Sequence, residues 1–209
     1  MEKLVLFDWG NVLIDSDYSS YNVILARKDI TRELKPEYPG KFLEIFDTAE
    51  FWIKNGNDLD MFVEEYLEKS KSISSVREFK EVYLQCYRRV PWYTNMVSLF
   101  SWYSRNHAVG ILSTLCEMDY ELLKEHLPMD QVKHRFFSFE LGVQKPNRKI
   151  YETAEENSGY SGKQIIFFDD RPDNVRAALD MDWQAYVTTG SDTYNVYSLL
   201  TEESKSHYS

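Results

Sequence analysis

Acidic and hydroxyl side chains stand directly after short apolar runs at three places in the sequence. Asp8 follows the first run and Ser113 follows a later one. The pair Asp169 and Asp170 follows a third apolar run, and Lys145 precedes that run in the sequence. Carboxylates so placed can act as a nucleophile or as metal ligands, and a hydroxyl and an ammonium group can bind phosphate oxygens. Together these residues predict a site for a phosphate group and a divalent cation.

Each of these residues also has an ordinary structural interpretation. Serine caps helices, lysine is most often a solvated surface residue, and paired acids favour a helix start because they complement its dipole. Asp8 taken alone also fits a turn, because Gly10 follows it closely. The prediction of a site therefore depends on the elements that carry these residues.

The apolar runs predict the strands of a parallel sheet. They are short and continuous, as strands buried on both faces are, and segments of helical spacing separate them. This alternation predicts an α/β fold with a Rossmann-like parallel sheet, in which ligands bind at the carboxyl ends of the strands. The predicted strands are 4–7, 107–112, 135–138, 164–168 and 184–187.

Strand-like runs are missing between about residue 15 and residue 90. Apolar residues recur there at helical spacing, as Phe79, Tyr83 and Cys86 do. We therefore predict two domains. The α/β core comprises residues 1–14 and 91–209, and an inserted α-helical cap domain comprises residues 15–90.

Composition and charge narrow the classes of function. The 209 residues include 43% apolar and 15% aromatic residues, enough for a sizeable core. The formal charge of −10, without a basic stripe, argues against a nucleic-acid partner. Two cysteines, the lack of an Asn-x-Ser/Thr sequon and an initial apolar run of only four residues predict a cytoplasmic protein with no membrane partner. A monomer and a homodimer are equally compatible with the sequence.

Four segments in order make the sequence similar to the haloacid dehalogenase (HAD) superfamily of phosphohydrolases. The resemblance covers nearly the whole chain. The helical stretch between the first two segments stands where members of the type-one (C1) cap subgroup place their cap. The segments are LVLFDWGNV at 4–12, ILST at 111–114, ELGVQKP at 140–146 and FFDDRPDNV at 167–175.

The resemblance implies a phosphatase with an aspartate nucleophile. Asp8 would attack the phosphorus of a small phosphorylated metabolite, with Ser113 and Lys145 as further catalytic residues, and water would hydrolyse the aspartyl-phosphate. Mg²⁺ would be held by Asp8, the Gly10 carbonyl and Asp170. The residues expected to bind phosphate are Gly10, Asn11, Ser113, Thr114 and Lys145, and those expected to support the site are Asp169 and Asn174.

Gly10 departs from the pattern of most phosphatases in the superfamily, which carry a second aspartate two residues after the nucleophile. That aspartate acts as general acid and base, a role that contributes ~10²–10⁴ in rate. The Asp-x-Gly-Asn start, followed by Asp15 and Asp17, is similar to bacterial sugar-1-phosphate phosphatases of the superfamily. Asp15 or Asp17 could replace the acid, or both could cap the first helix of the insert. Alternatively, the substrates have leaving groups that need little protonation.

Two other functions are compatible with the sequence. Dehalogenases of the superfamily use the same nucleophile without Mg²⁺, although the pair Asp169 and Asp170 favours phosphate chemistry. A binding or regulatory protein that keeps the fold with little or no turnover is suggested by Gly10. The sequence favours Mg²⁺-dependent hydrolysis of a small phosphomonoester, with sugar phosphates among the candidate substrates.

Overall fold

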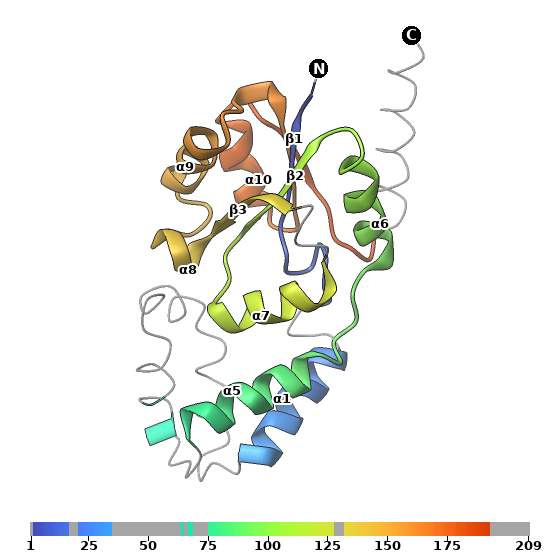
Figure 1. The fold of residues 1–209 in the computed structure, drawn as a ribbon, viewed down its shortest axis with the longest axis vertical. Helices are drawn as coiled ribbons and strands as arrows, with labels where there is room; N and C mark the ends of the chain where they lie inside the picture. The colour runs from blue at the N-terminus through green and yellow to red at the C-terminus, as the bar shows by residue number, and fades with distance from the viewer. Residues whose placement is uncertain are drawn as a thin grey trace.

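The described residues fold around a parallel β-sheet (Figure 1). The computed structural model describes residues 2–16, 21–34, 64, 67–68, 75–127 and 132–192. Within them, the sheet has five strands in the order β3-β2-β1-β4-β5, and every neighbouring pair is parallel. The strands are β1 (Leu4–Phe7), β2 (Ala108–Ser113), β3 (Val132–Phe137), β4 (Ile165–Asp169) and β5 (Gln184–Val187). The predicted α/β fold with a parallel sheet is confirmed.

Helices cover both faces of the sheet. The helices of the described residues are α1 (Tyr21–Leu34), α5 (Val76–Tyr87), α6 (Thr94–Tyr103), α7 (Glu117–His126), α8 (Ser138–Leu141), α9 (Arg148–Ser158), the 3₁₀ helix η1 (Gly162–Gln164) and α10 (Pro172–Leu179). Val5 and Phe7 of β1 pack in one apolar cluster with α6 and α7, and Leu4 and Leu6 pack in another with α9 and α10. All four residues of β1 are 0% exposed, which explains the uninterrupted apolar run. In the described part of the chain, no helix is long and apolar enough to cross a membrane.

The strand β3 differs from its prediction. It begins at Val132, three residues before the predicted start of 135, and Ser138 belongs to α8 instead. Lys133 and Arg135 are exposed, because β3 lies at the edge of the sheet and tolerates polar side chains. This alternation conceals the first residues of the strand from a search for continuous apolar runs. The strands β2 and β4 each begin and end one residue later than predicted.

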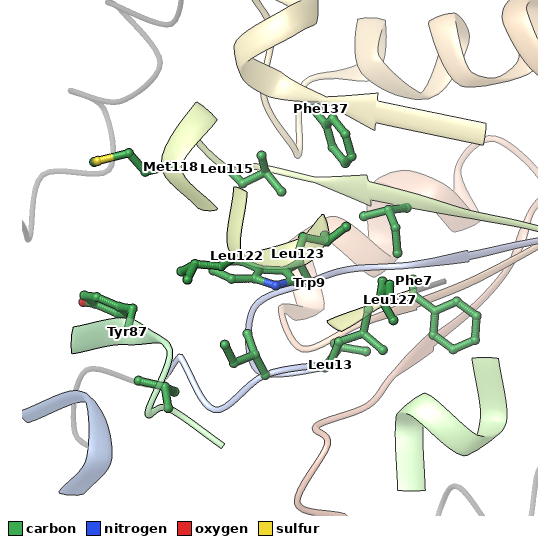
Figure 2. Close-up of a cluster of buried hydrophobic side chains, with 14 of the residues drawn as sticks. Phe7, Trp9, Leu13, Tyr87, Leu115, Met118, Leu122, Leu123, Leu127 and Phe137 are labelled. Atoms are coloured by element: carbon green, nitrogen blue, oxygen red, sulfur yellow. The ribbon is translucent and has the colours of Figure 1, made fainter. Parts of the chain in front are cut away.

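The apolar cluster on the α7 side of the sheet extends beyond β1 into the loop that follows (Figure 2). Trp9 belongs to the same cluster as Leu122 and Leu123 of α7, and its side chain is 6% exposed. Tyr87 of α5 belongs to the same cluster. Figure 1 shows α7 between the sheet and the pair α1 and α5. One continuous core therefore joins these two helices to the α/β part.

The helices α1 and α5 lie within the predicted insert and pack against each other. Ile30 of α1 and Phe79 of α5 are buried in the shared cluster, and Arg89 forms an ion pair with Asp29 at 3.0 Å. Much of the range 15–90 lies outside the described residues, so the division into core and cap domains stays a prediction.

The chain leaves the α/β part and returns to it at adjacent positions. An antiparallel bridge joins Ile14 to Trp92. The Asp15 N–H donates to the Pro91 carbonyl at 3.0 Å. We call the segment from Ile14 to Ser16 the first linker and the segment from Pro91 to Tyr93 the second linker. Both linkers lie near the loop that follows Asp8, because a bridge joins Gly10 to Ile14 and the Tyr93 N–H donates to the Leu13 carbonyl at 2.9 Å.

Tyr83 joins α5 to α7 through a hydrogen bond. Its hydroxyl donates to Asp119 Oδ1 at 2.7 Å, and burial raises the pKa of Asp119 above its ordinary value. Tyr83→Phe leaves this buried carboxyl short of a donor, so we expect the free energy of unfolding to fall by about 1–3 kcal/mol in urea titrations. The matched control is Tyr120→Phe, because the Tyr120 hydroxyl accepts from exposed Arg135. Its expected effect is below about 0.5 kcal/mol, and equal losses in the two variants would contradict the interpretation.

Candidate functional site

The pairing of β1 with β4 brings two of the predicted site carboxylates together. Phe7 of β1 pairs with Phe168 of β4. The next residues are Asp8 and Asp169, so both acids emerge from neighbouring strands at the same edge of the sheet. The strand order reverses at β1, since β2 lies on one side of it and β4 on the other. Open α/β sheets bind ligands at such a position.

Asp8 accepts three hydrogen bonds on a single carboxylate oxygen. Its Oδ1 accepts from Ser113 Oγ at 2.6 Å, from Lys145 Nζ at 2.8 Å and from the Trp9 N–H at 2.8 Å. Within the described residues, no donor is recorded on Oδ2. Asp8 is 7% exposed. The carboxylate is therefore held firmly on one side while its second oxygen remains available to a ligand.

Lys145 lies between two carboxylates. Its Nζ contacts Asp8 Oδ1 at 2.8 Å and Asp169 Oδ2 at 2.5 Å, and its side chain is 1% exposed. Burial by itself would lower the pKa of Lys145, but attraction to the two carboxylates outweighs it and raises that pKa. The Lys145 N–H also donates to Thr114 Oγ1 at 3.3 Å. Lys145 is therefore a buried, charged ammonium group, and Thr114 helps to hold its backbone.

Asp169 is fully buried and bound from several directions. Asn174 Nδ2 donates to both of its oxygens, at 2.9 and 3.1 Å, and the Arg171 N–H donates to Oδ1 at 2.8 Å. Tyr151 in turn donates to the Asn174 carbonyl at 3.0 Å. The ion pair of Asp169 with Lys145 had no signal in the sequence, because the two residues lie on different elements and only the fold brings them together.

Asp170 directly follows Asp169 in the chain and accepts a hydrogen bond from Asn11. Asn11 Nδ2 donates to Asp170 Oδ2 at 2.9 Å. Asn11 has a φ of 55°, a left-handed conformation that Asn tolerates better than most residues. Burial raises the pKa of Asp170, although the hydrogen bond from Asn11 opposes this effect.

The three acids form a group that fits a metal ion. Asp8, Asp169 and Asp170 offer oxygen atoms that all lie within 4.8 Å of one another. Burial raises the pKa of Asp8 to about 6 against the opposing charge of Lys145, and Asp169 adds to the rise. One ammonium group thus faces three carboxyl groups. Hard oxygen ligands with an excess of negative charge are suited to Mg²⁺ or a similar cation.

Gly10 stands where most phosphatases of the superfamily carry the general acid, and within the described residues neither Asp15 nor Asp17 is seen to take its place at the site. A Cβ added to Gly10 would lie 2.7 Å from Ser16 Oγ, so a serine hydroxyl fills this space. Asp15 is tied to the second linker, because the Tyr93 hydroxyl donates to its Oδ1 at 3.3 Å. Asp17 lies outside the described residues.

A segment after β5, which the sequence analysis did not single out, supports two of the site loops. The Thr188 N–H donates to the Asp169 carbonyl at 2.9 Å, and the Gly190 N–H donates to the Asn11 carbonyl at 2.7 Å. A Cβ at Gly190 would lie 2.0 Å from the Tyr93 ring, so only glycine fits there without a rearrangement. The feature of the sequence that could have indicated this segment is Gly190, which follows the last predicted strand.

Comparison with solved structures identifies the class of fold. A HAD family enzyme from Bacteroides thetaiotaomicron is 17% identical, with a TM-score of 0.75 over 93% of this chain and 96% of that chain. A predicted HAD-like family hydrolase from Porphyromonas gingivalis is 18% identical, with a TM-score of 0.73 over 96% of this chain and 98% of that one. The chain therefore has a HAD-like α/β fold. No protein-family model matches it.

The structural neighbours differ in their described chemistry. The Bacteroides thetaiotaomicron enzyme has also been crystallised in complex with magnesium and inorganic phosphate. A 2-haloacid dehalogenase from Pseudomonas syringae pv. Tomato DC3000 is 18% identical, with a TM-score of 0.66 over 88% of this chain and 85% of that one. The choice between phosphate and haloacid chemistry therefore depends on the residues of the site.

Proposed function

We propose that the chain is a Mg²⁺-dependent phosphatase that hydrolyses a small phosphomonoester through a covalent intermediate on Asp8. The observation that carries this proposal is the group of three carboxylates, Asp8, Asp169 and Asp170, at one edge of the sheet. Haloacid hydrolysis needs one carboxylate nucleophile and no cation, so it leaves the charge of this group unexplained. The neighbour crystallised with magnesium and phosphate supports the same choice.

The residues present would supply binding groups for both the cation and the phosphate. Mg²⁺ bound by Asp8, Asp170 and the Gly10 carbonyl would offset the repulsion between the Asp8 carboxylate and the phosphate. Ser113 and Lys145, which both contact Asp8 Oδ1, are placed to donate to phosphate oxygens as the phosphate approaches.

The reaction proceeds in two displacement steps. An Asp8 carboxylate oxygen forms a bond to phosphorus as the bond to the ester oxygen breaks, and the departing alcohol takes up a proton. A water molecule then attacks the same phosphorus, loses a proton and breaks the acyl-phosphate bond. The products are inorganic phosphate and the restored Asp8 carboxylate.

The source of the proton for the leaving oxygen distinguishes two versions of the mechanism. In one, Asp15 moves from its bond with Tyr93 towards the site and acts as the acid, or Asp17 takes this role. In the other, no side chain donates, and the enzyme uses substrates with stable leaving groups, such as the hemiacetal phosphates of sugars. Gly10 and the hydroxyl of Ser16 beside it motivate the second version.

The test is a hydrolysis assay on p-nitrophenyl phosphate and a panel of phosphorylated metabolites that includes sugar 1-phosphates. We expect release of inorganic phosphate that requires Mg²⁺ and stops in EDTA, and no halide release from 2-chloropropionate. Turnover that falls steeply with leaving-group pKa and is unchanged in Asp15→Asn supports the version without an Asp15 acid. Halide release without Mg²⁺ overturns the proposal. Mg²⁺-dependent binding of the panel without turnover supports the binding protein instead.

A further inference from the structure

The hydroxyl of Ser16 begins a short chain of hydrogen bonds that ends on Asp170. Ser16 Oγ donates to Asn11 Oδ1 at 3.3 Å, and Asn11 Nδ2 donates to Asp170 Oδ2 at 2.9 Å. An Asn side chain has one acceptor side and one donor side, so these two bonds define which way the amide faces. The first linker is thereby connected to a carboxylate of the candidate metal site.

The backbone of Asn11 is already held independently of its side chain. Its carbonyl accepts from the Gly190 N–H at 2.7 Å, and Gly190 is packed tightly against the ring of Tyr93. The remaining freedom of Asn11 is therefore the rotation of its side chain. Ser16 and Asp170 are the recorded partners of that side chain within the described residues.

The place of Ser16 is linked to the glycine at position 10. A Cβ at Gly10 would lie 2.7 Å from Ser16 Oγ but 3.8 Å from Ser16 Cβ. The hydroxyl therefore needs the space that a larger residue at position 10 would take, whereas the rest of the Ser16 side chain does not. The position of the Ser16 hydroxyl therefore depends on the absence of a side chain at position 10, where most phosphatases of the superfamily carry the acid.

We propose that Ser16 is a positioning residue that acts through Asn11 to hold Asp170 in the orientation in which it binds Mg²⁺. This inference rests on the metal site of the proposed function. A carboxylate that is already oriented loses less side-chain freedom when it binds a cation, so the affinity is higher. Because Ser16 belongs to the first linker, the position of that linker and the Mg²⁺ affinity are coupled.

The experiment is a calorimetric titration of Mg²⁺ into the full chain without substrate. Ser16→Ala is expected to weaken Mg²⁺ binding by about 3–10-fold, less than the 10–100-fold typical of residues that contact a metal ligand directly. Ser16→Thr keeps the hydroxyl and is expected to bind within about twofold of the unmodified chain. Ser98→Ala is the matched control, because the Ser98 hydroxyl donates to the Thr94 carbonyl on an exposed part of α6.

A double-mutant cycle tests the link between Ser16 and Gly10. In Gly10→Ala, the new Cβ displaces the Ser16 hydroxyl, so Mg²⁺ binding weakens as it does in Ser16→Ala. In the double variant, the hydroxyl is already gone and the Cβ has room, so the two losses are expected not to add. Urea midpoints without Mg²⁺ verify that each variant is folded.

The outcomes separate this inference from the function on which it rests. No Mg²⁺ binding by the unmodified chain overturns both. Tight binding by the unmodified chain with equal affinity in Ser16→Ala overturns the inference and leaves the proposed function intact. If the losses of Mg²⁺ affinity in Gly10→Ala and Ser16→Ala add fully in the double variant, the position of the Ser16 hydroxyl does not depend on Gly10, and that part of the inference is overturned.

Discussion

Replacing Asp8 by Asn is expected to abolish phosphate-ester hydrolysis and to make the metal-free protein more stable at neutral pH. The amide is a poor nucleophile and a weaker ligand for Mg²⁺, so kcat is expected to fall by at least about 10³-fold. Asn keeps the size of the side chain and an oxygen that can accept from Ser113 and the Trp9 N–H. The measurement is phosphate release at saturating Mg²⁺.

The gain in stability follows from the pKa of Asp8. Burial raises this pKa from 3.8 to about 6, so the folded state binds the proton more tightly than the unfolded state does. Stability from the protonated carboxyl is complete below about pH 4 and is lost as the pH rises through about 6. The amide of Asp8→Asn does not ionise and escapes this loss. In EDTA, the variant should therefore be more stable than the unmodified chain at about pH 7.5, with a smaller difference at about pH 4.5.

The matched control for this experiment is Asp173→Asn. Asp173 is an exposed residue in the first turn of α10. Its substitution is expected to leave turnover unchanged and to alter the free energy of unfolding by less than about 0.5 kcal/mol. Undiminished turnover in Asp8→Asn would exclude Asp8 as the nucleophile, and a loss of stability at neutral pH would contradict the electrostatic account.

Among the substitutions proposed for this protein, Lys145→Met is expected to lower the free energy of unfolding the most. The substitution keeps much of the apolar stem but removes the charge that lies 2.8 Å from Asp8 and 2.5 Å from Asp169. Breaking a buried ion pair from one side costs about 3–5 kcal/mol, because the remaining charges stay buried without compensation. Turnover is expected to fall by about 10²–10³-fold. Urea unfolding and phosphate release measure the two effects.

Mg²⁺ provides the internal check on this interpretation. If the loss comes from uncompensated carboxylates, saturating Mg²⁺ should restore part of the stability of Lys145→Met, and restore more than it adds to the unmodified chain. Lys149→Met, on the exposed surface of α9, is the matched control and is expected to change stability by less than about 0.5 kcal/mol. A loss in Lys145→Met that Mg²⁺ does not reduce points to packing instead of charge.

The parallel sheet and the acids at its edge could be predicted because both depend on local patterns. A strand buried on both faces, such as β1, is a continuous apolar run, and the residue after it must emerge at the carboxyl edge. The same logic predicts from the sequence alone that Asp8 and Asp169 lie at the same edge of the sheet. The start of the edge strand β3 was predicted three residues too late, because its exposed side chains interrupt the pattern.

The contacts inside the site could not be predicted, because they join distant segments through side-chain geometry. Nothing in the spacing of Lys145 and Asp169 indicates a contact of 2.5 Å. Ser16 was missed for a different reason. The Ser16 hydroxyl occupies space that is free only because Gly10 has no side chain, and the sequence shows the glycine but not which group fills the space beside it.

The adjacency of the two linkers has a consequence for how such a chain can change over time. The bridge between Ile14 and Trp92 holds the ends of the intervening segment together, so the closure of that loop is already made in the folded chain. The entropic cost of lengthening a loop grows only slowly with its length. Changes in chain length between the linkers are therefore expected to leave the register of the sheet intact, whereas changes to α1 or α5 would also alter the core that these helices share with α7.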